Sequence, residues 1–431
     1  MKIAFLYTVG AGLLAIAALT GWRYWGPENL QTAAETVKQI IPERKKTPEE
    51  LRAEALEKSK DIRGLYMTAD VASYDDAGAR RIRNNIIRIA EETEINGIVI
   101  DVKEVCGPDY DAENLKKLID ELHQKQIWAI ARIVAFKDSS QINVHPEWYL
   151  KRASPIAVGD GCARKKYLRV KGNAGDGIIY WRDNKGGYWL DPASRDARQY
   201  LADFSKKMID LGFDEIQFDY VRFPSDGDVA AAIYPAWTKK TAKDQVMKSF
   251  FEYLTRELRT YKPDIILSAD LFGYAAIRAG DVGIGQRLED IGSTFDYVSF
   301  MVYPSHYYSG LYLEADPAHN LPAVNLDKNG ARRNPGTVVY RSSLVARNFL
   351  DGLASTTVST SSPQAAIEKR HEVRLRPWLE DFFHDADKSL GNPYGAQKVR
   401  LQIDGAEKVE PHGWLLWNAS NVYTEGALKK E

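Results

Sequence analysis

The stretch GFDEIQFDYVRFP (Gly212–Pro224) contains a short apolar run that turns polar at its end. Side chains alternate between the two faces of a β-strand. Gln217 and Asp219 therefore share one face, and the apolar Ile216 and Phe218 share the other. We expect a strand at Asp214–Phe223 with Asp219 facing inward, late in the strand. Arg222 has the opposite parity to Asp219 and reaches the same side only if the strand ends or bulges before it.

Outward from this segment, apolar β-rich runs alternate with amphipathic helical stretches, as is typical of parallel βαβ units. Eight strands with intervening helices close a (β/α)8 TIM-type barrel. A doubly wound open sheet is the alternative, but no GxGxxG follows the first run. Long loops follow the third strand, up to Ala193, and the sixth, over Ser305–Pro335. The other seven expected strands are Gly64–Ala69, Gly97–Lys103, Trp128–Phe136, Ile265–Gly273, Tyr297–Pro304, Val373–Leu379 and Gly413–Asn418.

The amino-terminal region predicts export. Ile3–Trp22 has no charged residue and is long enough to cross a bilayer as a helix. Ala15-Ile16-Ala17 resembles a signal-peptide cleavage site, so residues 1–25 are either a cleaved signal peptide or a membrane anchor. Both alternatives place the rest of the chain in the periplasm or at the cell surface. We expect a polar, partly helical spacer at 26–61, the barrel at 62–424 and a tail at 425–431.

The composition limits the partners. The 58 Lys and Arg residues nearly balance the 59 Asp and Glu residues, which argues against a nucleic-acid binder. No Cys/His spacing typical of a metal site occurs, and we expect neither a metal nor another cofactor. Cys106 follows the second strand and Cys162 lies in the loop after the third. They predict one disulfide at the barrel mouth, with two free thiols as the alternative.

Polar residues gather at the carboxyl ends of the expected strands, where barrels of this kind carry their active sites. Asp101 and Lys103 lie late in the second strand, and Asp270 lies late in the fifth. Each carboxylate alone can instead belong to a buried ion pair, for example Asp101 with Arg132 or Lys103. Several strands with the same pattern favour a lined site. The aromatic residues at these ends, which suit stacking on sugar rings, are Tyr66, Tyr303, Trp378 and Trp417.

Paired carboxylates are the groups that cleavage of a glycosidic bond requires. Asp219 is the candidate nucleophile or base, because a nearby cation would keep it ionised. The cations considered are Arg222, Lys103 and Arg376. Asp270 is the candidate acid, and Asp101 and Glu104 are its rivals. The pattern predicts a polysaccharide or oligosaccharide substrate.

The chain resembles the glycosyl-hydrolase-like family named domain of unknown function 4015. The resemblance covers most of residues 62–424 and implies a TIM-type barrel related to glycoside hydrolases. Glu104 stands where an aspartate is expected in many relatives, and the Tyr308–Pro335 loop is particular to this chain. The segments that carry the resemblance are GLYMTA (Gly64–Ala69), NGIVIDVKEVCG (Asn96–Gly107), WLDPASRDARQYL (Trp189–Leu201), GFDEIQFDYVRFPSDG (Gly212–Gly227), YVSFMVYPSHY (Tyr297–Tyr307), LRPWLEDF (Leu375–Phe382) and GWLLWNASNVY (Gly413–Tyr423). The residues that it implies are shared are Asp101, Lys103, Asp219, Arg222, Tyr303, Trp378 and Trp417.

Three functions are consistent with these features. The first is an exported glycoside hydrolase that acts on a cell-surface or extracellular polysaccharide. The second is a non-catalytic barrel that binds envelope glycan and is tethered to the membrane. The third is a metal-dependent deacetylase or phosphodiesterase, against which the shortage of histidine at the strand ends speaks.

Overall fold

The computed structural model describes residues 44–155, 158–163, 179–278, 280–356, 373–382, 388–389, 391 and 394–430. The chain divides into two compact units, Met1–Glu50 and Leu51–Glu431, and the second contains the fold. The expected signal or anchor segment lies outside the described residues. Within the described ranges, no helix combines the length and the apolar character that crossing a membrane requires.

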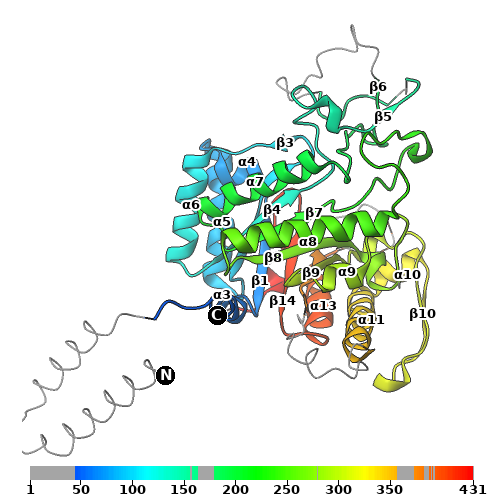
Figure 1. The fold of residues 1–431 in the computed structure, drawn as a ribbon. Coiled ribbons are helices and arrows are strands. Elements are labelled where there is room, and N and C mark those ends of the chain that lie inside the picture. Colours follow the sequence, from blue (N-terminus) through cyan, green and yellow to red (C-terminus); the bar gives the residue numbers. More distant parts are fainter. Residues whose placement is uncertain are drawn as a thin grey trace, which may run out of the picture. The chain divides into compact units, whose positions relative to one another are not determined.

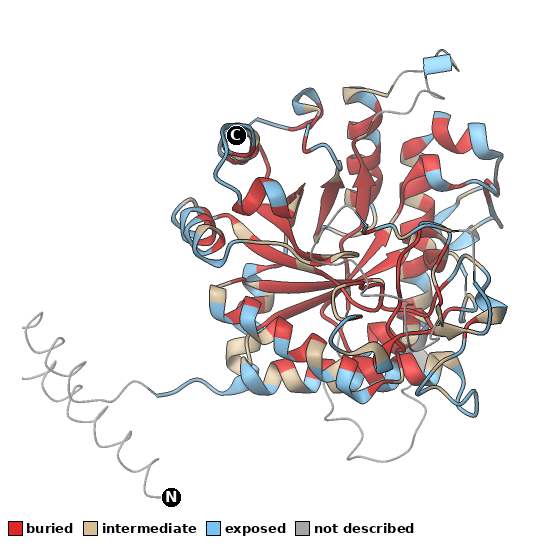
Figure 2. Ribbon diagram, turned by 90° about the horizontal axis from the view of Figure 1, so that it is seen from above, coloured by how far each residue is buried: buried red, intermediate tan, exposed pale blue. Residues whose placement is uncertain are grey.

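The second unit is a closed barrel of parallel strands with helices around it (Figures 1 and 2). Hydrogen bonding between the first and second barrel strands closes the ring, so the described part of the chain forms the predicted (β/α)8 barrel. The strands in chain order are β1 (Ile62–Met67), β2 (Gly97–Glu104), β4 (Trp128–Val134), β7 (Glu215–Asp219), β8 (Ile266–Phe272), β9 (Tyr297–Met301), the split pair β12 (Arg374–Leu375) and β13 (Trp378–Glu380), and β14 (Gly413–Trp417).

The seventh barrel strand differs from the continuous strand expected at Val373–Leu379. It consists of β12 and β13, separated by Arg376 and Pro377. Proline has no N–H to donate to a strand ladder, which accounts for the break at this point. The carbonyl of Pro377 still accepts a hydrogen bond from Leu415 N at 2.9 Å, so β14 stays in register across the gap.

Helices follow the strands as the amphipathic pattern predicts. Short polar caps set their ends: the Ser194 hydroxyl accepts from Ala197 N at the start of α7, and Gly212 ends α7 with a φ of 106°. The helices of the barrel wall are α5 (Ala77–Glu92), α6 (Ala112–Gln124), α7 (Arg195–Leu211), α8 (Lys243–Tyr261), α9 (Leu288–Gly292), α11 (Pro335–Thr356) and α13 (Ala396–Glu407).

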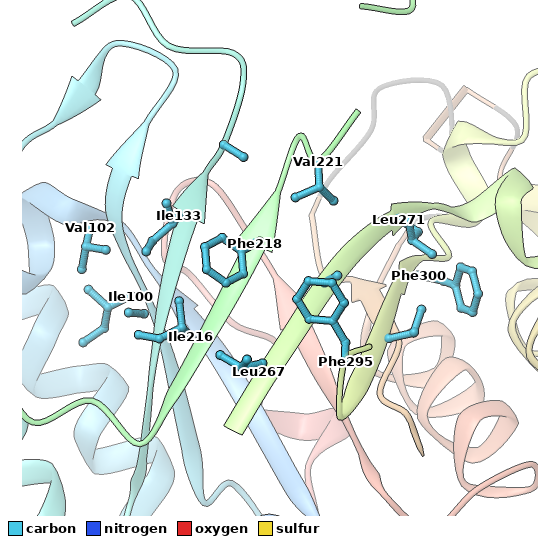
Figure 3. Close-up of a cluster of buried hydrophobic side chains, with 14 of the residues drawn as sticks. Ile100, Val102, Ile133, Ile216, Phe218, Val221, Leu267, Leu271, Phe295 and Phe300 are labelled. Atoms are coloured by element: carbon cyan, nitrogen blue, oxygen red, sulfur yellow. The ribbon is translucent and has the colours of Figure 1, made fainter. Parts of the chain in front are cut away.

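The main apolar core lies between the strands and these helices (Figure 3). Ile216 and Phe218 of β7 belong to it and are fully buried. Gln217, between them, points to the barrel interior, where its Nε2 donates to Ser299 Oγ at 3.2 Å. The alternation predicted for this strand is therefore confirmed, and it directs Asp219 inward.

The segments that flank the expected barrel on both sides contact the barrel. Helix α3 (Pro48–Lys58) lies largely within the barrel unit, which begins at Leu51 rather than at the expected residue 62. Arg52 pairs with Asp296 at 2.5 Å. At the other end, the expected tail is held by Lys429, whose N–H donates to Glu94 at 2.9 Å. Residues 51–61, predicted as the end of the spacer, thus lie in the same compact unit as the barrel.

Small hairpins decorate the long loops. The loop after β4 carries β5 (Lys151–Arg152) paired with β6 (Ile179–Tyr180), and the loop after β9 carries β10 (Leu311–Leu313) paired with β11 (Val324–Leu326). Cys106 and Cys162 form a disulfide, as predicted, with their Cα atoms 5.6 Å apart. The bridge ties the turn after β2 to the loop after β4.

Candidate active site

Three aspartates from three strands converge on one arginine at the carboxyl ends of the barrel strands. Arg132 of β4 binds Asp101 of β2 through Nη1 at 2.5 Å and Asp219 of β7 through Nη2. Its Nε lies 3.4 Å from Asp270 of β8. A guanidinium group offers donors on all its edges, which suits the simultaneous binding of several carboxylates. The cluster therefore brings the three predicted aspartates together.

Asp219 occupies the last position of β7. The next residue, Tyr220, has a φ of 52°, so the chain turns sharply as the strand ends. One carboxylate oxygen of Asp219 accepts from Tyr220 N at 2.6 Å, and the other accepts from Arg132. Both oxygens are thus oriented by donors on the mouth side of the barrel.

Asp270 has a different environment. Its Oδ1 accepts from the indole N–H of Trp378 at 2.8 Å, and it is almost completely buried. Burial raises the pKa of Asp270 well above its ordinary value, and the neighbouring charge of Asp219 raises it further. Arg132 opposes this shift without cancelling it. Asp270 therefore favours its protonated form, in which it can donate a proton.

Asp101 completes the cluster on the side of β1. It accepts a hydrogen bond from the Tyr66 hydroxyl as well as from Arg132. Burial raises the pKa of Asp101, although both donors act in the other direction. Glu104, the other predicted rival for the acid role, ends β2 at the rim and is half-buried.

Aromatic side chains line the mouth beside the cluster. Tyr303 stacks on Trp417 with ring centroids 5.9 Å apart, and Tyr66 contacts both Trp378 and Trp417. Phe382 meets Trp417 edge to face at 5.1 Å. Trp417 and Phe382 remain half-exposed, so their rings are accessible from the mouth. All four aromatic residues predicted for the site gather here; Phe382 was not predicted, because it follows the seventh strand rather than lying in it.

Arg222 reaches the mouth of the barrel because β7 ends at Asp219. The sequence predicted this placement only if the strand ended or bulged before Arg222. Its guanidinium carbon lies 4.6 Å from the ring centroid of Phe272, at the end of β8. Tyr220 and Trp189 flank it at 4.9 and 5.0 Å. Arg222 is therefore held by aromatic rings on the rim between β7 and β8.

Lys103 departs from its predicted position. The register between β2 and β4 shifts between Asp101 and Lys103, and Lys103 pairs with Ile133 instead of following the parity of Asp101. Its ammonium group binds Asp138 at 2.9 Å and the carbonyl of Val134 at 2.5 Å, fully buried. The expectation that Lys103 faces the site beside Asp219 is wrong, because a strand bulge redirects its side chain.

Arg376 is also misplaced by the sequence pattern. It pairs with Glu215, the first residue of β7, at 2.8 Å, and donates to the carbonyl of Ser59 at 2.8 Å. Its guanidinium carbon lies 3.7 Å from the ring centroid of Tyr297. Arg376 thus fills the amino-terminal end of the barrel, and the expectation that it supports Asp219 is wrong.

Arg132 is the residue of the candidate site whose importance the sequence pattern underestimated. The sequence suggests Arg132 only as a partner for Asp101 in a buried ion pair, and the structure contains that pair. Arg132 shares the inward parity of Ile130 in β4, so parity alone brings it to the interior. Its contacts with Asp219 and Asp270 depend on strands far away in the sequence.

A cavity of about 410 Å³ lies elsewhere, along the outer face of α7. Trp148, Tyr200 and Phe204 line it, and none of the clustered aspartates does. In the described ranges, no group of three or more His, Cys, Asp or Glu side chains is arranged to hold a metal ion. The candidate site is accordingly defined by the residues around Arg132.

Fold and site together define a TIM-type barrel whose polar cluster lies at the end where such barrels carry ligands. Residues 64–423 match the model of the family described as "Putative glycosyl hydrolase domain", and the chain belongs to this family. No curated protein matches the chain.

Solved structures with a similar fold are distant. A hypothetical protein from Ruminiclostridium thermocellum shares 27% identity, with 48% of this chain and 96% of that chain covered and a TM-score of 0.36. The α-amylase from H. orenii shares 12% identity over 83% of this chain and 68% of its own, with a TM-score of 0.45. The α-galactosidase from Thermus thermophilus shares 13% identity over 85% and 60%, with a TM-score of 0.44. This chain therefore spans less than two thirds of the galactosidase.

Proposed function

We propose that this protein is a glycoside hydrolase in which Asp219 and Asp270 are the catalytic pair. The observation that carries the proposal is the contrast between two neighbouring carboxyl groups that share Arg132. Asp219 accepts from two donors, whereas burial and the charge of Asp219 raise the pKa of Asp270. A carboxyl group that favours its protonated form, beside a second one held by a cation and a backbone N–H, is the arrangement that acid–base cleavage of a glycoside needs.

In this reaction the protonated Asp270 donates its proton to the glycosidic oxygen as the bond to the anomeric carbon breaks. Asp219 either attacks that carbon or removes a proton from the attacking water. Arg132 stays bound to Asp219 and orients it, and the positive charge of Arg132 limits repulsion between the carboxylates. The half-exposed rings of Trp417 and Phe382 provide faces on which a sugar can stack.

The direct test is the Asp219→Asn variant, assayed against a panel of bacterial and plant polysaccharides and oligosaccharides. We expect the wild-type chain to release reducing ends from at least one glycan, and the variant to lose activity by about 10³-fold or more. Asp120→Asn, which removes one exposed carboxylate from α6, is the matched control and keeps full activity. An Asp219→Asn protein that cleaves every substrate at the wild-type rate would refute the role of Asp219.

A non-catalytic glycan-binding barrel is the second candidate. One observation favours it: Asp219 is only 4% exposed and Asp270 only 1%, and both contact Arg132. Carboxylates held in a closed ion-pair cluster can be structural rather than reactive. This candidate is supported if the wild-type chain binds a glycan from the panel and never cleaves it, and if Asp219→Asn binds that glycan equally well.

The compartment proposed for this activity is the periplasm or the outer cell surface, on an envelope or extracellular polysaccharide. The uncharged segment Ile3–Trp22 supports export, and the Cys106–Cys162 disulfide is typical of an oxidising compartment. Fractionation of cells that produce the full chain tests this proposal. Recovery of the protein in the cytosolic fraction, with both thiols free, would contradict it.

A further inference from the structure

Arg222 is a buried cation without a carboxylate partner. It is 7% exposed, and no described Asp or Glu side chain lies within ion-pair distance of it. Its one hydrogen bond runs from Nη1 to the carbonyl of Phe223 at 3.0 Å. Buried charges in proteins are normally paired, so an arginine with no carboxylate partner among the described residues is suited to binding an anion.

The free edge of this guanidinium group has a defined shape. Among the described residues, Nε and Nη2 have no acceptor, and neither atom is sealed from solvent. These two nitrogens form the side edge of the guanidinium plane, which binds both oxygens of an oxyanion at once. The rings of Trp189, Tyr220 and Phe272 surround the guanidinium group of Arg222. These contacts fix the orientation of the guanidinium plane before a ligand binds.

The position of Arg222 places such an anion in the candidate active site. Tyr220 directly follows Asp219 in the chain, and Phe272 lies two residues after Asp270 on the same strand parity. Arg222 contacts both rings. An anion on its free edge therefore lies beside the exits of the two strands that carry the proposed catalytic pair.

The charge of the surrounding site permits an anion there. Arg132 binds Asp101 and Asp219, and Asp183 is paired with Lys137. Asp226, the other carboxylate that acts on Arg222, is exposed to solvent. Burial favours the neutral form of Asp270, so this carboxyl group adds little negative charge. Lys137, which lies over the Tyr220 ring at 5.4 Å, is already paired with Asp183 at 2.8 Å and does not compete for the anion.

We propose that Arg222 binds the carboxylate of a uronic acid residue, so that the substrate of this site is an acidic glycan. This inference rests on the proposed function for the identity of the site, and it adds the substrate class. The planar carboxylate supplies two oxygens at the spacing of Nε and Nη2, and the sugar ring that carries it can pack on the flanking aromatic rings.

The experiment measures binding without turnover. The full chain with Asp219→Asn is titrated with oligosaccharides of glucuronic, galacturonic and mannuronic acid, and with the neutral glucose, galactose and mannose oligosaccharides of the same linkage. Sulfated neutral oligosaccharides form a third arm. We expect at least one uronic acid oligosaccharide to bind about 10-fold or more tightly than its neutral match.

Variants then assign the preference to Arg222. Arg222→Met keeps a side chain of similar length among the rings and removes the charge. We expect it to reduce the preference to below 2-fold, mainly through weaker binding of the uronic acid oligosaccharides. Arg222→Lys keeps a charge without the two-nitrogen edge and loses most of the preference. Arg81→Met, on the exposed face of α5, is the matched control and keeps the preference. If Arg222→Met does not fold, Arg222→Lys alone decides.

Several results would overturn the inference: no binding of any uronic acid oligosaccharide, equal binding of acidic and neutral glycans, preference only for the sulfated arm, or equal loss of acidic and neutral binding in Arg222→Met. The proposed function fails separately. Acidic preference without any hydrolysis by the wild-type chain refutes the enzyme and leaves the inference standing. Hydrolysis of neutral glycans without a preference for acidic ones refutes the inference and leaves the proposed enzyme standing.

Discussion

Arg132 sets the chemistry of the site because it is shared by three carboxyl groups. Bringing Asp101, Asp219 and Asp270 out of water is costly unless a cation compensates them, and one guanidinium group cannot neutralise all three. The most deeply buried of them, Asp270, responds by holding its proton. The difference between the two proposed catalytic residues thus follows from one arginine and unequal burial.

The raised pKa of Asp270 predicts a specific pH dependence of stability. The folded chain keeps a proton on Asp270 that the unfolded chain loses above 3.8, its ordinary pKa value. The stability contribution of this group is therefore complete below 3.8 and is lost as the pH rises toward the folded-state pKa. Asp270→Asn removes this loss and keeps an acceptor for Trp378. We expect its stability, measured by urea unfolding, to improve relative to wild type between about pH 5 and about pH 8.

The same substitution separates stability from activity. Asp270→Asn has no proton to donate, so we expect kcat/KM on any substrate found to fall by about 10²-fold or more, while urea resistance at neutral pH does not fall. If the difference in stability between Asp270→Asn and the wild type is the same at about pH 5 and about pH 8, Asp270 is ionised in the folded chain. The assignment of Asp270 as the acid would then be withdrawn.

At the level of elements, α3 acts as part of the barrel. It covers the amino-terminal end, where Arg374 donates to the carbonyl of Leu56 at 2.7 Å and Arg376 donates to the carbonyl of Ser59. Ser59 and Tyr297 share a hydrogen bond of 2.9 Å between their hydroxyl groups. Arg374, Arg376 and Tyr297 at this end of the barrel thus have partners in a segment that the sequence pattern predicted as a spacer.

A chain that starts at residue 62 is therefore expected to be less stable than one that starts at residue 44. Removing α3 and Ser59 takes the carbonyls of Leu56 and Ser59 from Arg374 and Arg376 and the cation of Arg52 from Asp296. Each lost contact of a buried group costs about 1–3 kcal/mol. Urea unfolding of the two chains measures the difference. Arg52→Ala in the longer chain removes the ion pair with Asp296 but keeps the rest of α3, and it serves as an intermediate. Equal stability of both chains would contradict a structural role for α3.

For the whole molecule, the disulfide adds a covalent link between two loops at the carboxyl ends of the barrel strands. Cys106 and Cys162 are separated by 56 residues and link the turn after β2 to the loop after β4. The same loop supplies Trp189, which packs against Arg222 at the mouth. The bridge therefore restrains a segment that helps to form the candidate site.

Reduction of this bridge is expected to lower the free energy of unfolding by up to about 4 kcal/mol, from the entropy of a loop of this length. Urea unfolding with and without reductant measures the loss, and the double variant Cys106→Ser/Cys162→Ser is expected to match the reduced wild type. Far-UV circular dichroism should show that the barrel persists after reduction. Alkylation of two thiols without reductant would contradict the presence of the bridge.

Local alternation in the sequence was sufficient to predict seven of the barrel strands as continuous strands and the inward direction of Asp219, because side-chain parity depends only on the strand itself. The break at Arg376 and Pro377 in the seventh strand was not predicted. Lys103, Arg376 and Arg132 depended on the tertiary structure. A bulge turned Lys103 away from the mouth, a partner on β7 held Arg376 at the opposite end, and two strands distant in sequence gave Arg132 its shared role. Bulges and ion pairs form between strands, so the sequence of one strand is not sufficient to place them.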